Sequence, residues 1–240
     1  MNQRIPILMY HSIQVPRDNE VMRSLHVKPA SFARQMWLLN KLGYVGLSMR
    51  ELQPYLEGEK QGKVVGITFD DGYLNNLTAA APILKKHGFS GTCYVVSSAI
   101  GGDNFWDHHL GIPSNEIMNA NQILEWESFG LEIGCHTKTH PDLTNLSYEA
   151  QIDELKQCKT ALENITGKPA VSFCYPYGKY NEQLSKLARN VGFETSTTMN
   201  RGRATKSDDP HELPRIPINF HTLPHLFLLK ILTSYEDKKH

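Results

Sequence analysis

The chain has 240 residues, which is enough to bury one large core, so we expect a single domain over residues 1–240. Its 25 lysines and arginines balance its 25 aspartates and glutamates, and the basic residues form no block. This neutrality argues against a nucleic acid partner and suits an uncharged ligand.

The N-terminus enters an apolar segment within a few residues, which leaves no room for a signal peptide. No run approaches the roughly 18 apolar residues of a membrane-spanning helix. We therefore expect the chain as written to be soluble and cytoplasmic. A protein trimmed of an export signal would show the same features, so an exported form stays open.

Strand-like and helix-like segments alternate along the chain, which is the pattern of a parallel α/β fold. Residues 7–10 are predicted as a short buried strand, and His11 follows at its C-terminal end. Residues 31–43 begin with a serine, carry apolar residues at helical spacing and end in glycine. This pattern predicts a helix capped by Ser31.

The next predicted strand, residues 64–69, ends in two adjacent carboxylates, Asp70 and Asp71, followed by Gly72. A carboxylate at a strand end can bind a metal or accept a proton, and two neighbours can divide these tasks. The alternative is an ordinary surface turn, because Asp-Gly is a common turn dipeptide.

A helix over residues 77–87 and a strand over residues 91–96 are predicted next. Residues 97–120 form a long irregular stretch that contains Phe105 and Trp106. We expect a rim loop there, whose aromatic side chains contact substrate or pack against the domain. A short predicted helix with Trp126 follows.

Residues 131–136 are predicted as another strand that ends at His136, and His140 follows four residues later. Two imidazoles at this spacing can close on one ion. With one carboxylate they make a three-ligand catalytic zinc site that keeps a coordination position open for water. Two exposed histidines are the alternative, because such pairs also arise by chance.

The alternation continues to the C-terminus, with an aromatic strand at Phe173 that runs into the turn Tyr-Pro-Tyr177-Gly. The remaining predicted elements are helices over residues 147–166 and 180–191 and strands over residues 193–198 and 213–218.

The tail, residues 223–240, begins with a strongly apolar run. Three interpretations compete: a helix that closes the barrel, a surface for a partner, or an anchor for peripheral membrane contact.

Three of these strand ends match the motifs of one family in the right order. Thr-Phe-Asp70-Asp71-Gly, His136-Thr-Lys-Thr-His140 and Tyr-Pro-Tyr177-Gly resemble the first three motifs of the polysaccharide deacetylases, the NodB-homology carbohydrate esterases. His11 fits the branch that deacetylates poly-N-acetylglucosamine, in which the catalytic-histidine motif lies at the start of the chain. The resemblance spans about residues 5 to 220.

The resemblance implies a distorted, TIM-like (β/α) barrel of about seven strands. It implies a metal-dependent hydrolase that removes N-acetyl groups from glycans that contain N-acetylglucosamine. By the same resemblance, Asp71, His136 and His140 would hold a divalent ion, first Zn²⁺, with Co²⁺, Ni²⁺ or Mn²⁺ as substitutes.

The resemblance also implies roles for the other motif residues. Asp70 would take the proton of the attacking water, and His11 would protonate the leaving amine. The backbone N–H of Tyr177 would stabilise the oxyanion. For sugar binding, the rings of Trp126 and Tyr177 could stack on a pyranose, although Trp126 on a helix is also a typical core residue.

The chain departs from the family at one position. Many members begin the third motif with an arginine that holds the catalytic aspartate, but here that residue is Cys174. A thiol can neither carry a positive charge nor form a bidentate pair. We predict that Arg215, in the strand over residues 213–218, pairs with Asp70 instead; an ordinary surface arginine is the alternative.

Two other functions remain open from the sequence. One is deacylation or deformylation of a lipid-linked amino sugar at a membrane surface, which the apolar tail would suit. The other is a catalytically weak glycan-binding module that uses the same groove. The sequence leaves the glycan, its linkage, the acyl group and the oligomeric state open.

Overall fold

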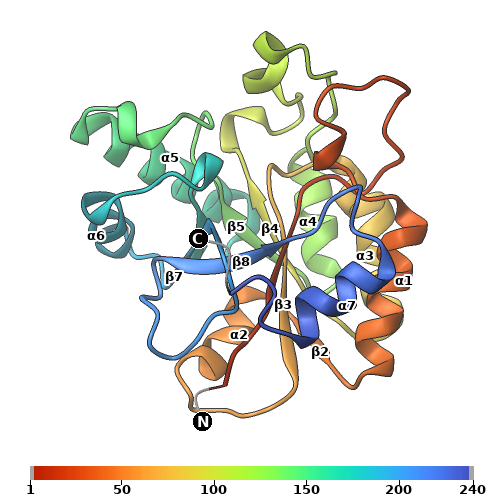
Figure 1. Ribbon diagram of the computed structural model, residues 1–240. Helices are drawn as coiled ribbons and strands as arrows, with labels where there is room; N and C mark the ends of the chain where they lie inside the picture. The colour runs from red at the N-terminus through yellow and green to blue at the C-terminus, as the bar shows by residue number, and fades with distance from the viewer. Residues whose placement is uncertain (1–2, 238–240) are drawn as a thin grey trace.

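The computed structural model describes residues 3–237, and within them seven parallel strands close into a barrel (Figure 1). The strands are β1 (Ile7–Tyr10), β3 (Val64–Phe69), β4 (Thr92–Val95), β5 (Glu132–Cys135), β6 (Ser172–Cys174), β7 (Thr195–Arg201) and β8 (Leu213–Pro217). The ring closes because β1 pairs with both β3 and β8. The predicted barrel is confirmed.

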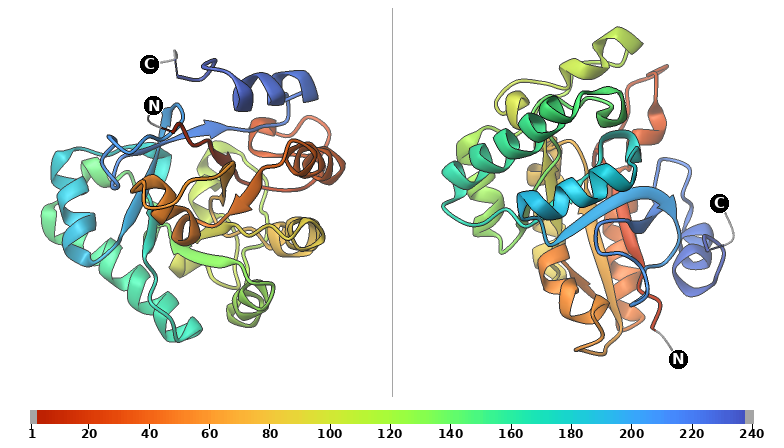
Figure 2. Two further views of the ribbon diagram at one scale, coloured as in Figure 1. Left: turned by 90° about the horizontal axis from the view of Figure 1, so that it is seen from below. Right: turned by 90° about the vertical axis from the view of Figure 1, so that its left-hand side faces the viewer.

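One strand and one helix between β1 and β3 were not predicted. The short strand β2 (Val45–Leu47) lies outside the ring and pairs with the first half of β3. Helix α2 (Met49–Leu56) follows and starts with a capping box formed by Ser48. Its apolar face packs on side chains inside the barrel and covers the N-terminal end, which Figure 2 shows from below.

Six further helices surround the barrel, with α5 and α6 on one side and α1 and α3 on the other in Figure 1. They are α1 (Pro29–Lys41), α3 (Ala81–His87), α4 (Ala120–Ser128), α5 (Tyr148–Thr166), α6 (Glu182–Val191) and α7 (Pro224–Leu232).

The predicted helices are present with shifted ends. A turn of π-helix, Asn76–Ala80, precedes α3 within the predicted helix over residues 77–87. The predicted cap of α1 is wrong. Pro29 occupies the first turn, where its fixed φ suits a helix start, and Ser31 therefore lies inside the helix.

The rim loop over residues 97–120 is more ordered than predicted. It contains two short 3₁₀ helices, Ser97–Ala99 and Phe105–Leu110, and α4 begins at its last residue. A bridge between Asp103 and Glu116 ties the two arms of the loop together.

The apolar tail forms α7, which packs beside α1. Phe227 and Ile231 are buried, whereas Leu223, Leu229 and Leu232 face outwards. Residues 238–240 of the predicted tail lie outside the described residues. Across residues 3–237, the helices are too short or too polar to span a bilayer.

Two acidic residues after α7 tie the tail to the barrel. Glu236 is buried beside the end of β7, and Asp237 reaches the N-terminal segment. The ion pairs are Arg201–Glu236 and Lys230–Glu236, both at 2.6 Å, Arg203–Asp237 at 2.7 Å and Arg4–Asp237 at 2.6 Å.

Candidate active site

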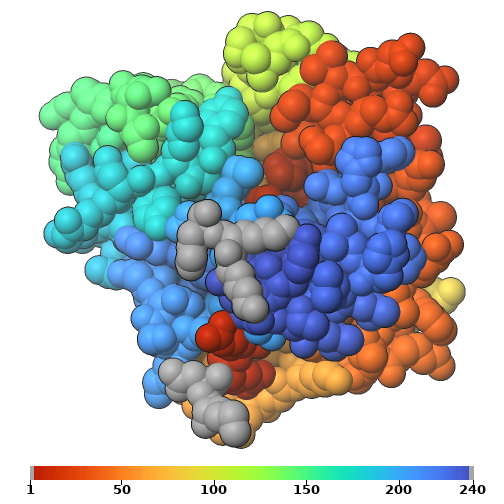
Figure 3. All heavy atoms as spheres, in the orientation of Figure 1, coloured from red at the N-terminus to blue at the C-terminus, as the bar shows by residue number. Residues whose placement is uncertain are grey.

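The predicted site residues converge where the strands end at the C-terminal face of the barrel. β1 leads into His11, β3 into Asp70 and Asp71, and β5 into His136. They line a cavity of about 380 Å³, where the surface in Figure 3 is hollowed between the upper loops. Barrels of this type place their chemistry at this end, so the position agrees with an active site.

Asp71, His136 and His140 form a group that fits a divalent ion, since their ligand atoms lie within 4.8 Å of one another. The Nε2 atoms of His136 and His140 lie 3.4 Å and 3.5 Å from Oδ1 of Asp71. Two ligand atoms on a tetrahedral zinc, each about 2.0–2.1 Å from the ion, stand roughly 3.3 Å apart. The donor set therefore has the type and spacing of a three-ligand site.

The histidine tautomer also suits an ion. Nδ1 of His136 donates a hydrogen bond of 2.8 Å to the carbonyl oxygen of Cys174, so Nε2 is the ring atom that faces Asp71 and would bind an ion. Burial, and then the neighbouring His136, lower the pKa of His140 to about 3, which keeps its imidazole neutral and able to bind a cation.

The carboxylate of Asp71 is held in its ionised form. Burial alone would raise its pKa, but the hydrogen bond with His136 and then the charge of His11 bring the pKa well below its usual range. Burial, and then the charge of the same carboxylate, raise the pKa of the nearby Tyr73 phenol, which therefore stays protonated.

The backbone around the site adopts uncommon conformations. Asp71, His140 and Tyr177 have φ values of 77°, 60° and 57°, in the left-handed region that side chains other than glycine rarely adopt. The Thr137 hydroxyl accepts from the backbone N–H of His140 and supports one of these turns. Such strained residues cluster at functional sites because the surrounding fold holds them there.

Arg215 occupies the position predicted for it, against Asp70. Its Nη1 and Nη2 atoms donate to the two carboxylate oxygens of Asp70 at 2.7 Å and 2.8 Å. The remaining N–H groups donate to the Thr198 carbonyl oxygen, the Thr68 hydroxyl and the Cys174 sulfur, so all five donors are used.

This pair controls the charge of Asp70. Burial alone would raise the pKa of Asp70, but the guanidinium of Arg215 opposes it and the pKa lies below the ordinary value. Asp70 is therefore an ionised, buried carboxylate beside the proposed ion ligands.

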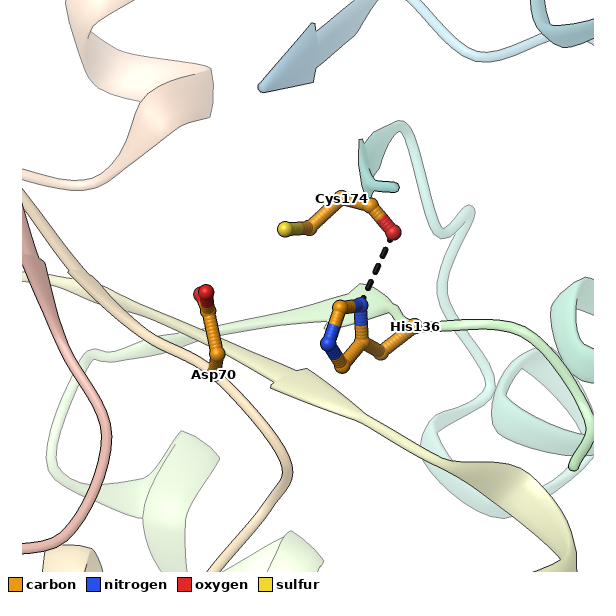
Figure 4. Close-up of side chains that lie close together, drawn as sticks. All are labelled: Asp70, His136 and Cys174. Atoms are coloured by element: carbon orange, nitrogen blue, oxygen red, sulfur yellow. Dashed lines mark hydrogen bonds between the residues drawn. The ribbon is translucent and has the colours of Figure 1, made fainter. Parts of the chain in front are cut away.

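A second group, Asp70, His136 and Cys174, has side chains close enough to share an ion (Figure 4). However, both Asp70 oxygens and the Cys174 sulfur already accept hydrogen bonds from Arg215. A cation there would lie against a guanidinium, and like charges repel strongly in a buried site. Of the two groups, Asp71, His136 and His140 therefore fit a divalent ion better.

His11 faces Asp70 across the cavity, with its Nε2 atom 3.9 Å from Oδ2. Its side chain is 19% exposed, so its ring can reach a ligand in the cavity. The Asn76 amide donates to the His11 carbonyl oxygen and fixes the backbone there.

Two aromatic rings pack on the ligand His140. Trp106, from the rim loop, stacks on it with ring centroids 4.7 Å apart, and Tyr177 meets it edge-on at 4.7 Å. Tyr177 remains 42% exposed beside the cavity, so its ring is available to a sugar.

Comparison with known proteins agrees with this geometry. The sequence model of the polysaccharide deacetylases matches residues 57–196. YxkH of Bacillus subtilis (strain 168), named as a polysaccharide deacetylase, is 32% identical over 218 residues, which cover 90% of this chain and 72% of that protein. The chain belongs to the polysaccharide deacetylase family. It is therefore an N-deacetylase hydrolase by family.

The chain is also similar to two other deacetylases. The poly-beta-1,6-N-acetyl-D-glucosamine N-deacetylase of Staphylococcus aureus is 25% identical over 225 residues, 87% of this chain and 73% of that protein. The Streptococcus pyogenes deacetylase PplD, solved in complex with acetate, superposes with a TM-score of 0.84 at 29% identity. That match covers 96% of this chain and 99% of PplD.

Trp126 does not line the cavity of this deacetylase, so its expected stacking on sugar is corrected. Its side chain is fully buried on α4, its Nε1 donates to the Glu132 carbonyl oxygen at 2.8 Å, and its ring packs against Phe69. The helical spacing of the sequence does not show which side of a helix lies at a cavity. In the folded protein, the indole N–H of Trp126 has a hydrogen-bond acceptor and its ring is packed in the core.

The sequence analysis did not single out two residues of the site. Tyr73 directly follows the Asp-Asp-Gly motif, so its closeness to Asp71 in the chain was an available signal. Asp107, in the rim loop, also lines the cavity and belongs to no motif.

Proposed function

We propose that this protein removes N-acetyl groups from N-acetylglucosamine-containing glycans in a metal-dependent reaction that releases acetate. The observation that carries the proposal is that the two adjacent carboxylates, Asp70 and Asp71, have different partners. Asp71 contacts the two histidines, whereas both oxygens of Asp70 are paired with Arg215. The similarity to a poly-N-acetylglucosamine deacetylase supports the choice of glycan.

Asp71, His136 and His140 would hold the ion. Bound there, a divalent cation would supply Lewis acidity, which lowers the pKa of water and polarises an amide carbonyl. Three ligands of nitrogen and oxygen type favour Zn²⁺, and Co²⁺, Ni²⁺ or Mn²⁺ could take its place.

Asp70 serves as the general base in this proposal. Each of its oxygens accepts one hydrogen bond from Arg215, and a carboxylate oxygen has a second lone pair for the proton of the attacking water. Because the guanidinium keeps Asp70 ionised, the base is ready at neutral pH.

His11 and Tyr177 act on the other atoms of the acetamide. A protonated His11, whose Nε2 lies 3.9 Å from Oδ2 of Asp70, donates to the leaving nitrogen, so that the amine departs neutral. The backbone N–H of Tyr177, in the turn after β6, supports the negative charge that develops on the carbonyl oxygen.

The test is acetate release from N-acetylglucosamine oligomers by protein stripped with a chelator and reloaded with Zn²⁺ or Co²⁺. Activity should vanish with the metal and return with it. His140→Ala should lose metal and activity, whereas His225→Ala, an exposed histidine on α7, should keep both. Bound metal and bound sugar without acetate would contradict the proposal and indicate a glycan-binding module.

The outward leucines of α7 favour a second substrate class. Leu223, Leu229 and Leu232 are exposed and could rest on a lipid surface, where a lipid-linked amino sugar would be deacylated or deformylated. Replacing Leu229 and Leu232 by glutamine leaves the buried face of α7 intact. Loss of vesicle binding and of activity on lipid-linked sugar alone would support this function, whereas a wild-type protein that does not bind vesicles and acts only on soluble oligomers would exclude it.

A further inference from the structure

A third carboxylate, Asp107, lines the cavity and takes no part in the reaction described above. It belongs to the 3₁₀ helix Phe105–Leu110 of the rim loop and is only 6% exposed. It lies outside the groups of described residues that could share an ion. Asp107 is therefore a buried acid at the cavity, and the proposed ion site does not explain why it is there.

The loop holds Asp107 in a fixed place. Its backbone N–H donates to the Asn104 carbonyl oxygen at 3.0 Å, and Asn104 is the residue that directly precedes the 3₁₀ helix. Asn104 is itself buried, and its Oδ1 accepts from the Asn115 backbone N–H at 2.7 Å. The next residue toward the N-terminus, Trp106, stacks on His140. A carboxylate anchored in this way is pre-organised for a ligand.

The surroundings favour a ligand that donates hydrogen bonds. Burial, and then the charge of Asp71, raise the pKa of Asp107, so the cavity penalises the bare carboxylate. A buried carboxylate is tolerated when hydrogen-bond donors satisfy it. Leu110 and Ile112, which follow Asp107 in the same loop and also line the cavity, offer no polar side chain, so Asp107 is the acceptor that this segment presents to a ligand.

We propose that Asp107 is a specificity residue that accepts hydrogen bonds from hydroxyl groups of the sugar whose acetamide is cleaved. The inference rests on the proposed function, because it takes the substrate to be an uncharged glycan. In such a substrate, the hydroxyls are the abundant donors and no cation is present to pair with the carboxylate. An acetyl oxygen, by contrast, needs donors and would be repelled by Asp107.

The experiment compares two substrates that both carry an acetyl group. N-acetylglucosamine oligomers contain the sugar, whereas 4-nitrophenyl acetate is an aryl ester without one. Asp107→Ala should lower kcat/KM for the oligomers by about 10- to 100-fold, because a hydrogen bond to a charged group is lost. The loss should appear mainly in KM, as expected for an interaction made equally in the bound and transition states. Hydrolysis of the aryl ester and bound metal should stay unchanged.

Two further variants make the test decisive. Asp103→Ala removes a carboxylate from the same loop that does not line the cavity and should leave the oligomer kinetics unchanged. If Asp107→Ala does not fold, Asp107→Asn keeps the shape and should show a smaller loss on the oligomers alone.

Three results separate the hypotheses. An equal loss on both substrates, or a shifted pH profile with the ester, would show that Asp107 acts on the reacting atoms and would overturn the inference. Unchanged oligomer kinetics in Asp107→Ala would also overturn it. A wild-type enzyme that hydrolyses the ester but releases no acetate from any oligomer would instead refute the proposed function.

Discussion

Removing the Arg215 guanidinium should destabilise the protein strongly. Arg215→Met keeps an unbranched apolar side chain but leaves the Asp70 charge buried without its cation, and Thr198 loses a donor to its carbonyl oxygen. Breaking a buried ion pair by removing one partner costs about 3–5 kcal/mol. For a chain of this size we expect a fall in Tm of roughly 6–20 °C, at about 2–4 °C per kcal/mol.

The same change should affect catalysis through the pKa of Asp70. With Arg215 gone, burial is the main influence left on Asp70, and burial raises a carboxyl pKa. The acidic limb of the kcat/KM profile should move to higher pH, and the rate at neutral pH should fall by up to the 10²–10⁴-fold that a general base typically contributes. Bound metal should persist, because Arg215 contacts none of the three proposed ligands.

The assays are chemical unfolding, metal analysis and acetate release between about pH 5 and 9. Arg203→Met is the matched control, since Arg203 also pairs with a carboxylate but at Asp237, away from the cavity. It should lower stability without moving the pH profile. If Arg215→Met unfolds like the wild type and keeps its pH profile, the reasoning is refuted.

An exchange of two side chains tests the geometry further. Cys174 Sγ lies 3.2 Å from Nη2 of Arg215, so position 174 faces the same space. The double variant Cys174→Arg, Arg215→Cys places the arginine where many family members have it. It should recover part of the activity that Arg215→Cys loses, and a double variant no better than that single variant would show that the two positions are not equivalent.

Three further outcomes are expected from the structure. Asp70→Asn should keep bound metal but lose about 10²–10⁴-fold in turnover, and near-normal turnover at saturating metal would contradict its role as base. Trp126→Ala should cost about 3–5 kcal/mol of unfolding free energy while leaving KM for oligomers unchanged in the folded fraction, as measured by urea unfolding and kinetics. Burial would raise the pKa of Glu236, but its two basic partners hold this pKa below the ordinary 4.5. The contribution of the ionised Glu236 to stability is therefore complete above pH 4.5 and is lost as the pH falls through the lower pKa of the folded state. The stability gap between wild type and Glu236→Gln should accordingly shrink on acidification, and a gap that widens would reverse the argument.

Much of the barrel was predictable because most of its strands are recognisable in the sequence as short apolar runs with defined ends. The run over residues 64–69 is apolar and β-branched and ends in acids, and it forms β3 with those bounds. β2 has only three residues, which is too short for a period, and α2 has Pro54 in its interior, which argues against a helix although Met49, Leu52 and Leu56 recur at helical spacing. Their structure depends on β3 and on the open end of the barrel, which are tertiary features.

The sequence predicts those site residues that belong to recognisable motifs. It does not predict residues that only the folded chain brings to the cavity. Asp71, His136 and His140 occur in motifs, and the structure brings them together. Arg215 was found because Cys174 left a buried carboxylate without its cation, so the missing charge had to come from another strand. Asp107 stands in a loop of no regular pattern, and only the folded loop brings it to the cavity.

The place of β1 in the ring explains how His11, the proposed general acid, can reach the cavity from a strand early in the chain. β1 lies between β8 and β3, and its parallel pairing with both neighbours sets the position of His11. A strand that followed β8 in the chain could fill the same slot and present the same imidazole. The geometry at the cavity thus does not depend on the order of the strands along the chain. A circularly permuted enzyme in which β1 follows α7 should retain its active site.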